Sequence, residues 1–302
     1  MYLSCRDRVG RSPISLHPHA SGDHMKRRTF VQALGTAAAG ALVARRDLLA
    51  ARRLNHVGLE LYSVRHAMQA DPDRTMAAVR AAGYDQVELL WSMNNFGRTP
   101  QQVRDVLKKE GLKAPSAHIS PSILTENWAQ HLADAQLLGM TYLIVPSLPE
   151  SARTIDDWKK WADTFNGAGA IARKAGLWLA FHNEPDHMKP IDGQIPYDVF
   201  LKQLDPKVVR LQLDVGNMVM GGGDPMAYLK KHPNWYWSFH LKDVVPDKSS
   251  DTELGAGTVN LKKLLAAVPN LSSKPCYVEQ EGPKDELASA KQNCAYLKKL
   301  TF

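Results

Sequence analysis

The sequence predicts a single α/β domain of the (β/α)8-barrel class, spanning residues 54–302. After residue 54, short apolar segments alternate eight times with longer segments that have the period of amphipathic helices. Eight such units in roughly 250 residues match one closed barrel, whereas an open doubly wound sheet usually has fewer strands. A dinucleotide-binding sheet is also disfavoured, because no Gly-x-Gly-x-x-Gly motif follows the first strand.

The expected elements are short strands, each followed by a longer helix. The strands cover residues 56–62, 86–90, 112–118, 142–146, 177–182, 209–214, 237–241 and 276–279. The helices cover residues 73–82, 100–110, 126–138, 154–174, 196–203, 224–231, 259–267 and 284–299. Several helices have recognisable ends, since a capping side chain precedes proline at Asp71, Thr99 and Asp224, and glycine follows at Gly83 and Gly111.

Residues 1–53 are expected to be an upstream extension and an export signal. The paired Arg27 and Arg28, followed by a mildly apolar, Ala- and Gly-rich run over 33–44, resemble a twin-arginine signal. Met25 is the expected start of this signal. The apolar run is too short and too weakly apolar to be a stable membrane anchor. These features predict export to the periplasm.

The net charge of the chain lies entirely in this N-terminal segment. The whole chain carries 38 Lys and Arg against 31 Asp and Glu. Residues 1–53 contain ten of the bases and three of the acids, so 54–302 holds 28 of each. A neutral body lacks the basic surface that a phosphate backbone requires, which argues against nucleic acid as a partner. Three cysteines make no disulfide framework, and the sequence leaves the oligomeric state open.

The expected strands are apolar on one face and ionisable at the C-terminal end of the other. Side chains alternate across a strand, so in a barrel one set faces the helices and the other faces the axis. The axial sets are Glu60 and Tyr62, Gln86 and Glu88, Ser116 and His118, then Ala180, His182 and Glu184, then Arg210, Gln212 and Asp214, then Ser238, His240 and Lys242, and finally Tyr277, Glu279 and Glu281. Barrel active sites form at this end of the strands.

A ring of carboxylates and imidazoles needs a positive charge at its centre. Burying several acids together is costly unless the acids are paired or bind a metal. We therefore expect one divalent metal ion at the C-terminal end of the barrel.

Three segments in chain order resemble the sugar phosphate isomerase/epimerase-like proteins, which belong to the xylose isomerase-like barrels of the AP endonuclease family 2 superfamily. The segments are Leu213-Asp214-Val215-Gly216-Asn217, Phe239-His240-Leu241-Lys242-Asp243 and Val278-Glu279-Gln280-Glu281. Residues 58–65 and 254–257 are similar as well, so the resemblance covers the chain from about residue 55 to its end. It implies that Asp214, His240 and Glu279 bind the metal.

The fourth ligand departs from the family pattern. The family usually supplies a glutamate from strand five, but here His182 stands at that place and Glu184 follows two residues later. Both face the axis. Glu184 is expected to be the fourth ligand or a catalytic base, and His182 to be a ligand or to support one. This ligand set suits Mn²⁺, Co²⁺, Zn²⁺ or Mg²⁺ alike.

The resemblance implies an isomerase or epimerase that moves a proton at the carbon next to a carbonyl of a sugar or keto-sugar. The metal would stabilise the enediolate. Glu279 is a candidate for both ligand and base, with Glu184 or Glu88 on the other side of the substrate. His118 and Lys242 are candidates for contacting hydroxyl groups or steadying the oxyanion.

Two other functions remain open at this point. The same chemistry would make a lyase if it eliminated the aglycone from an oxidised (3-keto) glycoside. Export and the absence of a Gly-rich phosphate cradle favour a substrate without phosphate. A carbohydrate-binding barrel without catalysis is the alternative from a different class. Aromatic residues are candidates for stacking on a sugar, namely Tyr62, Trp91, Trp128 and Trp235.

Overall fold

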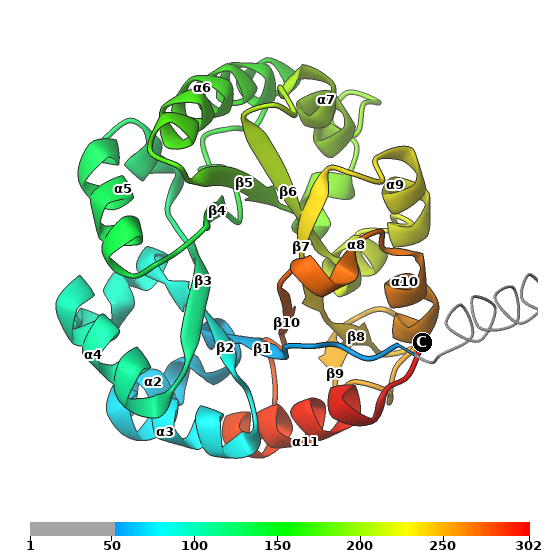
Figure 1. Ribbon diagram of the computed structural model, residues 1–302. Helices are drawn as coiled ribbons and strands as arrows, with labels where there is room; N and C mark the ends of the chain where they lie inside the picture. The colour runs from blue at the N-terminus through cyan, green and yellow to red at the C-terminus, as the bar shows by residue number, and fades with distance from the viewer. Residues whose placement is uncertain (1–51) are drawn as a thin grey trace, which may run out of the picture. The chain divides into compact units, whose positions relative to one another are not determined.

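The computed structural model describes residues 52–302, and the strands there close into a barrel with the helices outside it (Figure 1). The eight barrel strands are β1 (Gly58–Glu60), β2 (Gln86–Leu90), β3 (Lys113–His118), β4 (Tyr142–Val145), β5 (Trp178–His182), β6 (Val209–Asp214), β7 (Tyr236–Leu241) and β10 (Cys276–Val278). Their order round the ring is β1-β10-β7-β6-β5-β4-β3-β2, and every neighbouring pair is parallel. The expected (β/α)8 barrel is confirmed.

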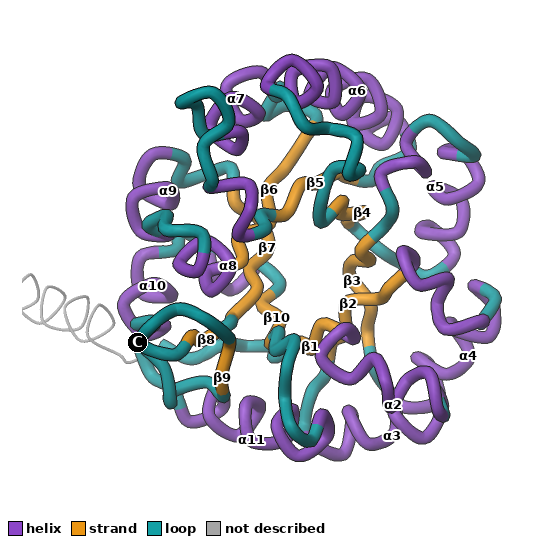
Figure 2. The backbone as a smooth tube through the Cα atoms, turned by 180° about the vertical axis from the view of Figure 1, so that it is seen from behind, coloured by secondary structure: helices purple, strands orange, loops and turns teal. Residues whose placement is uncertain are grey.

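Helices follow the strands and form the outer ring (Figure 2). They are α2 (Arg65–Ala70), α3 (Pro72–Ala82), α4 (Pro100–Glu110), α5 (Trp128–Leu137), α6 (Ile155–Lys174), α7 (Pro196–Gln203), α8 (Val215–Met220), α9 (Pro225–Lys231), α10 (Leu261–Ala267) and α11 (Glu286–Lys299). Short 3-10 helices lie at η1 (Leu61–Val64), η2 (Trp91–Gly97), η3 (Pro121–Leu124), η4 (Pro185–Met188) and η5 (Leu271–Ser273). The sequence patterns did not indicate α2, α8 or these 3-10 helices.

The helix boundaries follow from the capping residues. Thr99 and Thr154 each close a capping box with the third residue of α4 and α6. Gly83 and Gly111 end α3 and α4 at φ values of 108° and 66°, a backbone region that side chains with a Cβ disfavour. These ends lie where the sequence predicted them.

The two ends of the barrel axis differ in chemistry. At the N-terminal ends of the strands, Tyr142, Trp178 and Trp237 pack together. The guanidinium of Arg210 lies 3.9 Å from the ring centroid of Trp178 and 4.7 Å from that of Trp237. The buried polar side chains gather at the opposite, C-terminal end.

Beyond the barrel strands, β8 (Asp243–Val244) and β9 (Asp251–Thr252) form an antiparallel hairpin after β7. The backbones of Arg52 and Phe302 pair with each other, so the two ends of the described chain lie side by side. Within residues 52–302, no helix is long and apolar enough to cross a membrane. The expected start at Met25 and the export signal lie outside the described residues and stay predictions.

Two glycines of α6 differ in how closely they approach the strand layer. A Cβ added at the buried Gly169 would lie 2.7 Å from the backbone oxygen of Val208, while one added at the exposed Gly167 would meet nothing within 4 Å. We expect Gly169→Ala to lower the free energy of unfolding by about 1–3 kcal/mol. Gly167→Ala, the control in the same helix, should raise it by about 0.5–1 kcal/mol. Urea unfolding followed by circular dichroism measures both, and equal effects would contradict this packing.

Candidate metal centre and active site

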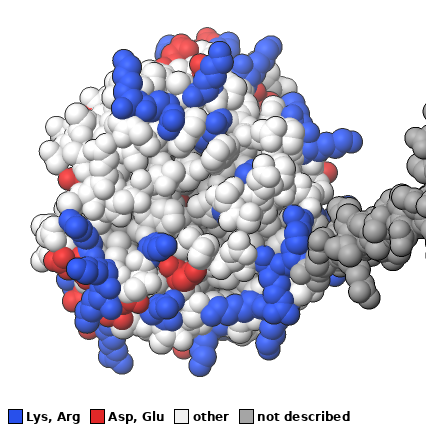
Figure 3. Space-filling view, viewed as in Figure 1, with Lys and Arg blue, Asp and Glu red and all other residues white. Residues whose placement is uncertain are grey.

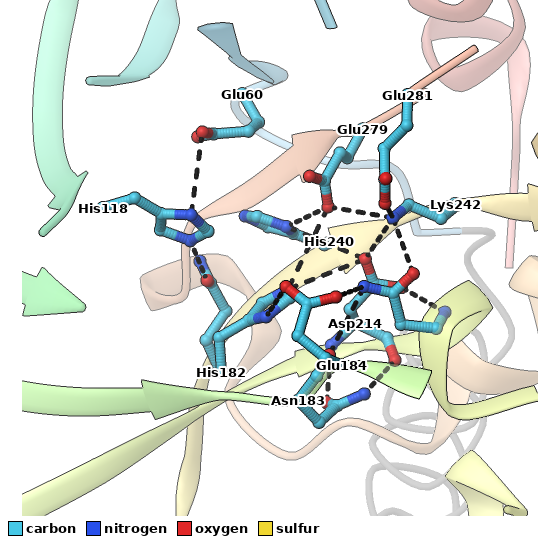
Figure 4. A network of polar contacts seen from close by, with 12 residues as sticks. Glu60, His118, His182, Asn183, Glu184, Asp214, His240, Lys242, Glu279 and Glu281 are labelled. Atoms are coloured by element: carbon cyan, nitrogen blue, oxygen red, sulfur yellow. Dashed lines mark hydrogen bonds and ion pairs between the residues drawn. The ribbon is translucent and has the colours of Figure 1, made fainter. Parts of the chain in front are cut away.

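Four of the expected metal-binding residues converge at the C-terminal ends of four strands (Figure 4). His182 ends β5, Asp214 ends β6, His240 lies in β7 and Glu279 follows β10. Each offers one ligand atom, and these four atoms lie within 4.8 Å of one another. All four residues are buried. The alternation of side chains along the strands therefore predicted the axial positions correctly.

Asp214 is fixed by the junction between β6 and α8. Its Oδ1 accepts the backbone N–H of Asn217 at 2.7 Å, so it caps α8. The side chain of Asn183 bonds the backbone N–H and carbonyl of Asp214 at 3.0 and 2.9 Å. These bonds orient the carboxylate and leave Oδ2 facing His182 at 3.6 Å.

His240 lies between two carboxylates. Its Nδ1 is 2.6 Å from Glu279 Oε2, and its Nε2 is 2.5 Å from Glu88 Oε2. Burial alone would lower the pKa of His240, but these two carboxylates raise it to about 10. Burial likewise acts to raise the pKa of Glu279, while Lys242 and His240 hold it well below its usual range. His240 therefore presents Nδ1 to the four-residue cluster and Nε2 to Glu88.

Glu88 lies behind His240 in a closed polar network. It accepts hydrogen bonds from Ser116 Oγ at 2.5 Å and from Gln212 Nε2 at 3.0 Å, besides its contact with His240. Burial acts to raise the pKa of Glu88, but the charges of His118 and His240 and these hydrogen bonds lower it to about 2. A carboxylate behind a metal-binding imidazole fixes the ring orientation and its protonated nitrogen.

Lys242 supplies a buried positive charge beside the cluster. Its Nζ lies 3.0 Å from Asp214 Oδ2 and 3.3 Å from Glu279 Oε2, and it donates to Asn217 Oδ1 and Glu281 Oε1. Burial would lower the pKa of Lys242, but the surrounding carboxylates raise it well above its usual value. The ammonium group therefore stays charged.

The first turn of α8 lies directly against the Lys242 side chain. A Cβ added at Gly216 would lie 2.6 Å from Lys242 Cγ. Gly216, two residues after Asp214, therefore lets the helix that Asp214 caps approach the lysine closely.

Glu184 lies at the rim of the cluster, with its side chain about a third exposed (32%). Its Oε2 accepts from Asn217 Nδ2 at 2.9 Å, and its Oε1 is 3.5 Å from His182 Nδ1. Burial raises the pKa of Glu184 to about 7. Its backbone N–H donates to Nδ1 of His187, whose pKa burial lowers to about 3. The loop after β5 is thereby held in place.

His118 and Glu60 lie on the other side of His240 (Figure 4). His118 Nε2 is 2.9 Å from Gln212 Oε1, and its Nδ1 is 3.8 Å from Glu60 Oε1. Burial lowers the pKa of His118 to about 4. Burial and the nearby Glu88 carboxylate raise the pKa of Glu60 well above its usual range.

The aromatic residues expected to contact a sugar divide into two pairs. Tyr62 and Trp91 lie in η1 and η2, directly after the C-terminal ends of β1 and β2. Trp91, Trp128 and Trp235 are all buried, but of these three only Trp128 and Trp235 donate their indole N–H groups to backbone oxygens of the core within residues 52–302. The expectation of a sugar contact was wrong for these two, because a tryptophan at a helix start or before a strand gives no sign of its direction.

The polar atoms at the centre fit a bound cation. In the described part of the chain, both nitrogens of His182 are buried and form no hydrogen bond, and the buried Oδ2 of Asp214 forms an ion pair with Lys242 but no hydrogen bond. Buried polar groups are nearly always partnered, so such atoms facing one another need an explanation. Two imidazoles and two carboxylates form a donor set that binds transition metals and zinc. A divalent cation between them would satisfy these atoms.

Asp243 is a structural residue that the sequence analysis did not identify. Its carboxylate accepts the backbone N–H groups of Val244, Gly255, Gly257 and Val259, at 2.8 to 3.0 Å. It thereby fixes the hairpin segment that follows Lys242. An aspartate directly after an axial lysine, followed by a glycine-rich stretch, was the signal available in the sequence.

The chain belongs to the family of xylose isomerase-like TIM barrels, whose model matches residues 76–300. The family resemblance drawn from the strand-end motifs is thereby confirmed. The fold and the match together define an enzyme acting on sugars, of isomerase or lyase type.

Particular relatives are inosose dehydratases. The chain is 26% identical over 256 residues to that of Bacillus cereus, which covers 72% of this chain and 84% of the relative. It is 27% identical over 175 residues to that of Salmonella typhimurium, which covers 51% and 57%.

Solved structures share the fold. A sugar phosphate isomerase/epimerase from Parabacteroides distasonis is similar with a TM-score of 0.70 and 25% identity, covering 82% of this chain and 99% of that one. The IolI protein with a bound zinc atom is similar with a TM-score of 0.63 and 14% identity, covering 80% and 97%.

The role of Asp243 can be tested by removing its charge. Asp243→Asn should turn an amide N–H₂ toward backbone donors and lower the free energy of unfolding by about 2 kcal/mol or more. Amide exchange in residues 255–259 should accelerate. The control is Asp247→Asn in the same hairpin, which is exposed and should change stability by less than about 0.5 kcal/mol. Hydrogen-exchange mass spectrometry measures the difference, and unchanged protection would contradict the role.

Proposed function

We propose that this protein is a divalent-metal-dependent lyase that removes a proton next to the carbonyl of a keto-sugar or a related keto-polyol and then eliminates a group from the neighbouring carbon. The observation that carries the proposal is the convergence of four buried ligand residues, among which His182 has no hydrogen-bond partner within residues 52–302, beside a carboxylate whose pKa lies near neutrality. The inosose dehydratases among the relatives support elimination over isomerisation.

His182, Asp214, His240 and Glu279 would hold the cation. The geometry supports His182 over Glu184 as the fourth ligand, because only His182 offers an atom to this four-residue group. A bound divalent cation supplies electrostatic stabilisation to the negative charge that develops on a carbonyl oxygen. The donor set suits Mn²⁺, Co²⁺, Zn²⁺ or Mg²⁺ alike.

Glu184 would act as the base. A base is most effective when its pKa is close to the working pH, and burial brings that of Glu184 to about 7. Its hydrogen bond from Asn217 orients one carboxylate oxygen, while the other faces the centre. The carboxylate takes the proton from carbon, and the C–H electrons form the enediolate. These electrons then expel the oxygen on the next carbon, and the protonated Glu184 gives its proton to that departing oxygen.

The other expected catalytic residues would position the ligands. Glu88 holds His240, and Lys242 holds Asp214 and Glu279 while offsetting their charge. Glu279 is too closely engaged by its neighbours to serve easily as the base as well. The leaving group would be water or, in an oxidised (3-keto) glycoside, the aglycone.

Epimerisation is the second candidate, favoured by the similarity to the Parabacteroides distasonis isomerase/epimerase. It uses the same first step but returns the proton to the carbon instead of expelling a group. The carbohydrate-binding barrel without catalysis finds no support among the relatives.

The metal ligands can be tested one at a time. Asp214→Asn and His240→Ala should each lower the bound divalent metal by one equivalent per chain and abolish activity, with the far-UV circular dichroism unchanged. Metal content is measured by inductively coupled plasma mass spectrometry. Asp186→Asn is the control, because that side chain is exposed on η4. Retention of the metal in both ligand variants would refute the assignment.

The base can be separated from the metal ligands. Glu184→Gln should lower kcat by about 10²–10⁴-fold while the metal content stays that of the wild type. The assay follows inosose and 3-keto-glycosides in D₂O by NMR, in which a lyase releases water or the aglycone and an epimerase exchanges deuterium without release. If the metal-loaded wild type neither releases water or the aglycone nor exchanges deuterium, the proposed function is contradicted. A fully active Glu184→Gln would exclude Glu184 as the base.

A further inference from the structure

The carboxylate of Glu60 accepts no hydrogen bond from the described residues, and its nearest charged-group contact there is His118 Nδ1 at 3.8 Å. Glu60 ends β1, and its side chain is fully buried. Glu88, Asp214 and Glu279 each have hydrogen-bonding or charged partners. An ionised carboxylate buried without a partner is strongly unfavourable. Glu60 therefore requires a cation or a proton that the polar network around it does not supply.

The imidazole of His118 presents an acceptor to Glu60. Gln212 Nε2 donates to Glu88 and to Ser238 Oγ, so Gln212 Oε1 is the atom that faces His118 Nε2. His118 Nε2 must then be the donor of that bond. With the proton on Nε2, Nδ1 of the neutral ring carries a lone pair, and it points toward Glu60 (Figure 4).

The spacing between these two acceptors fits a shared cation. His118 Nδ1 and Glu60 Oε1 are 3.8 Å apart, which is too long for a hydrogen bond. Two ligand atoms bound to one metal at about 2.0–2.2 Å each are separated by about 3–4 Å. One atom each of Glu60, Glu88, His118 and His240 lie within 4.8 Å of one another.

We propose that Glu60, Glu88 and His118 bind a second divalent cation, next to the first and linked to it through the His240 ring. His240 faces Glu279 with Nδ1 and Glu88 with Nε2, so the ring stands between the two groups. A set of two carboxylates and one imidazole suits Mn²⁺, Co²⁺ or Zn²⁺ better than Ca²⁺.

The charge balance of the centre agrees with a second cation. Four carboxylates are buried together on the axis, namely Glu60, Glu88, Asp214 and Glu279. Lys242 is the only Lys or Arg side chain among residues 52–302 that is buried. Lys242 and the cation that the proposed function places at Asp214 both lie on the side of Asp214 and Glu279, and within residues 52–302 no Lys or Arg forms an ion pair with Glu60. The inference rests on the proposed function for that first cation alone.

The number of bound ions tests the second site. The full chain is stripped with a chelator, reconstituted with Mn²⁺, freed of loose metal by gel filtration and analysed for manganese. We expect two equivalents in the wild type and one in Glu60→Gln, whose amide keeps the shape of the carboxylate. The control is Glu126→Gln, an exposed residue after η3, which should keep two. Two equivalents in Glu60→Gln, or one in both proteins, would overturn the proposal.

Two further measurements separate this inference from the proposed function. Electron paramagnetic resonance of the wild type with Mn²⁺ should show a spin-coupled pair and needs no variant; an uncoupled six-line signal at full loading would count against the second site. Asp214→Asn should lose the first ion and keep the second. A single equivalent that Asp214→Asn loses and Glu60→Gln keeps would refute the second site and leave the proposed function standing. A single equivalent that Glu60→Gln loses and Asp214→Asn keeps would refute the first site.

Discussion

Neutralisation of carboxylates on the barrel axis is the constraint on which the rest of the site depends. Taking a carboxylate out of water costs several kcal/mol even after the surroundings relax, and this cost is recovered only by well-placed opposite charge and hydrogen bonds. Lys242 offsets part of the negative charge of Asp214 and Glu279. Glu88 is stabilised by His240, Ser116 and Gln212. The negative charge that these contacts do not offset faces the space between His182, Asp214, His240 and Glu279.

The same constraint explains the local structure around the centre. One carboxylate oxygen of Asp214 caps α8, and the other faces the four-residue cluster. The side chain of Asn183 holds the backbone of Asp214 in place. Gly216 lets α8 approach Lys242, and Asp243 ties down the hairpin that follows. The strand ends, the first turn of α8 and the hairpin thus hold the clustered side chains by short local contacts. A site fixed in this way needs little rearrangement when a cation binds.

The sequence was sufficient to predict the barrel, its strands and the side chains that face the axis. The alternation along β6 and β7 alone places Asp214 and His240 on the axis, because side-chain direction is a local property of a strand. The contact between Glu88 and His240 could not be predicted, since it depends on the stagger of strands across the closed ring. Asn183 and the β8–β9 hairpin were missed for a related reason: their roles arise from loop conformations that carry no period in the sequence.

That Glu60 accepts no hydrogen bond from residues 52–302 could not be predicted from the sequence either. That residue was expected on the axis, but only the arrangement of Glu88, Gln212 and His118 shows that every nearby donor is already engaged. Sequence patterns indicate which residues face inward. Which of them remain unsatisfied depends on the hydrogen-bond network as a whole.

Anomalous diffraction from crystals grown with Mn²⁺ tests the central claim most directly. Data collected at a wavelength where manganese scatters anomalously should show a peak about 2.0–2.3 Å from one atom each of His182, Asp214, His240 and Glu279. An anomalous map without a peak among these four side chains, in crystals whose protein contains stoichiometric manganese, would contradict the account.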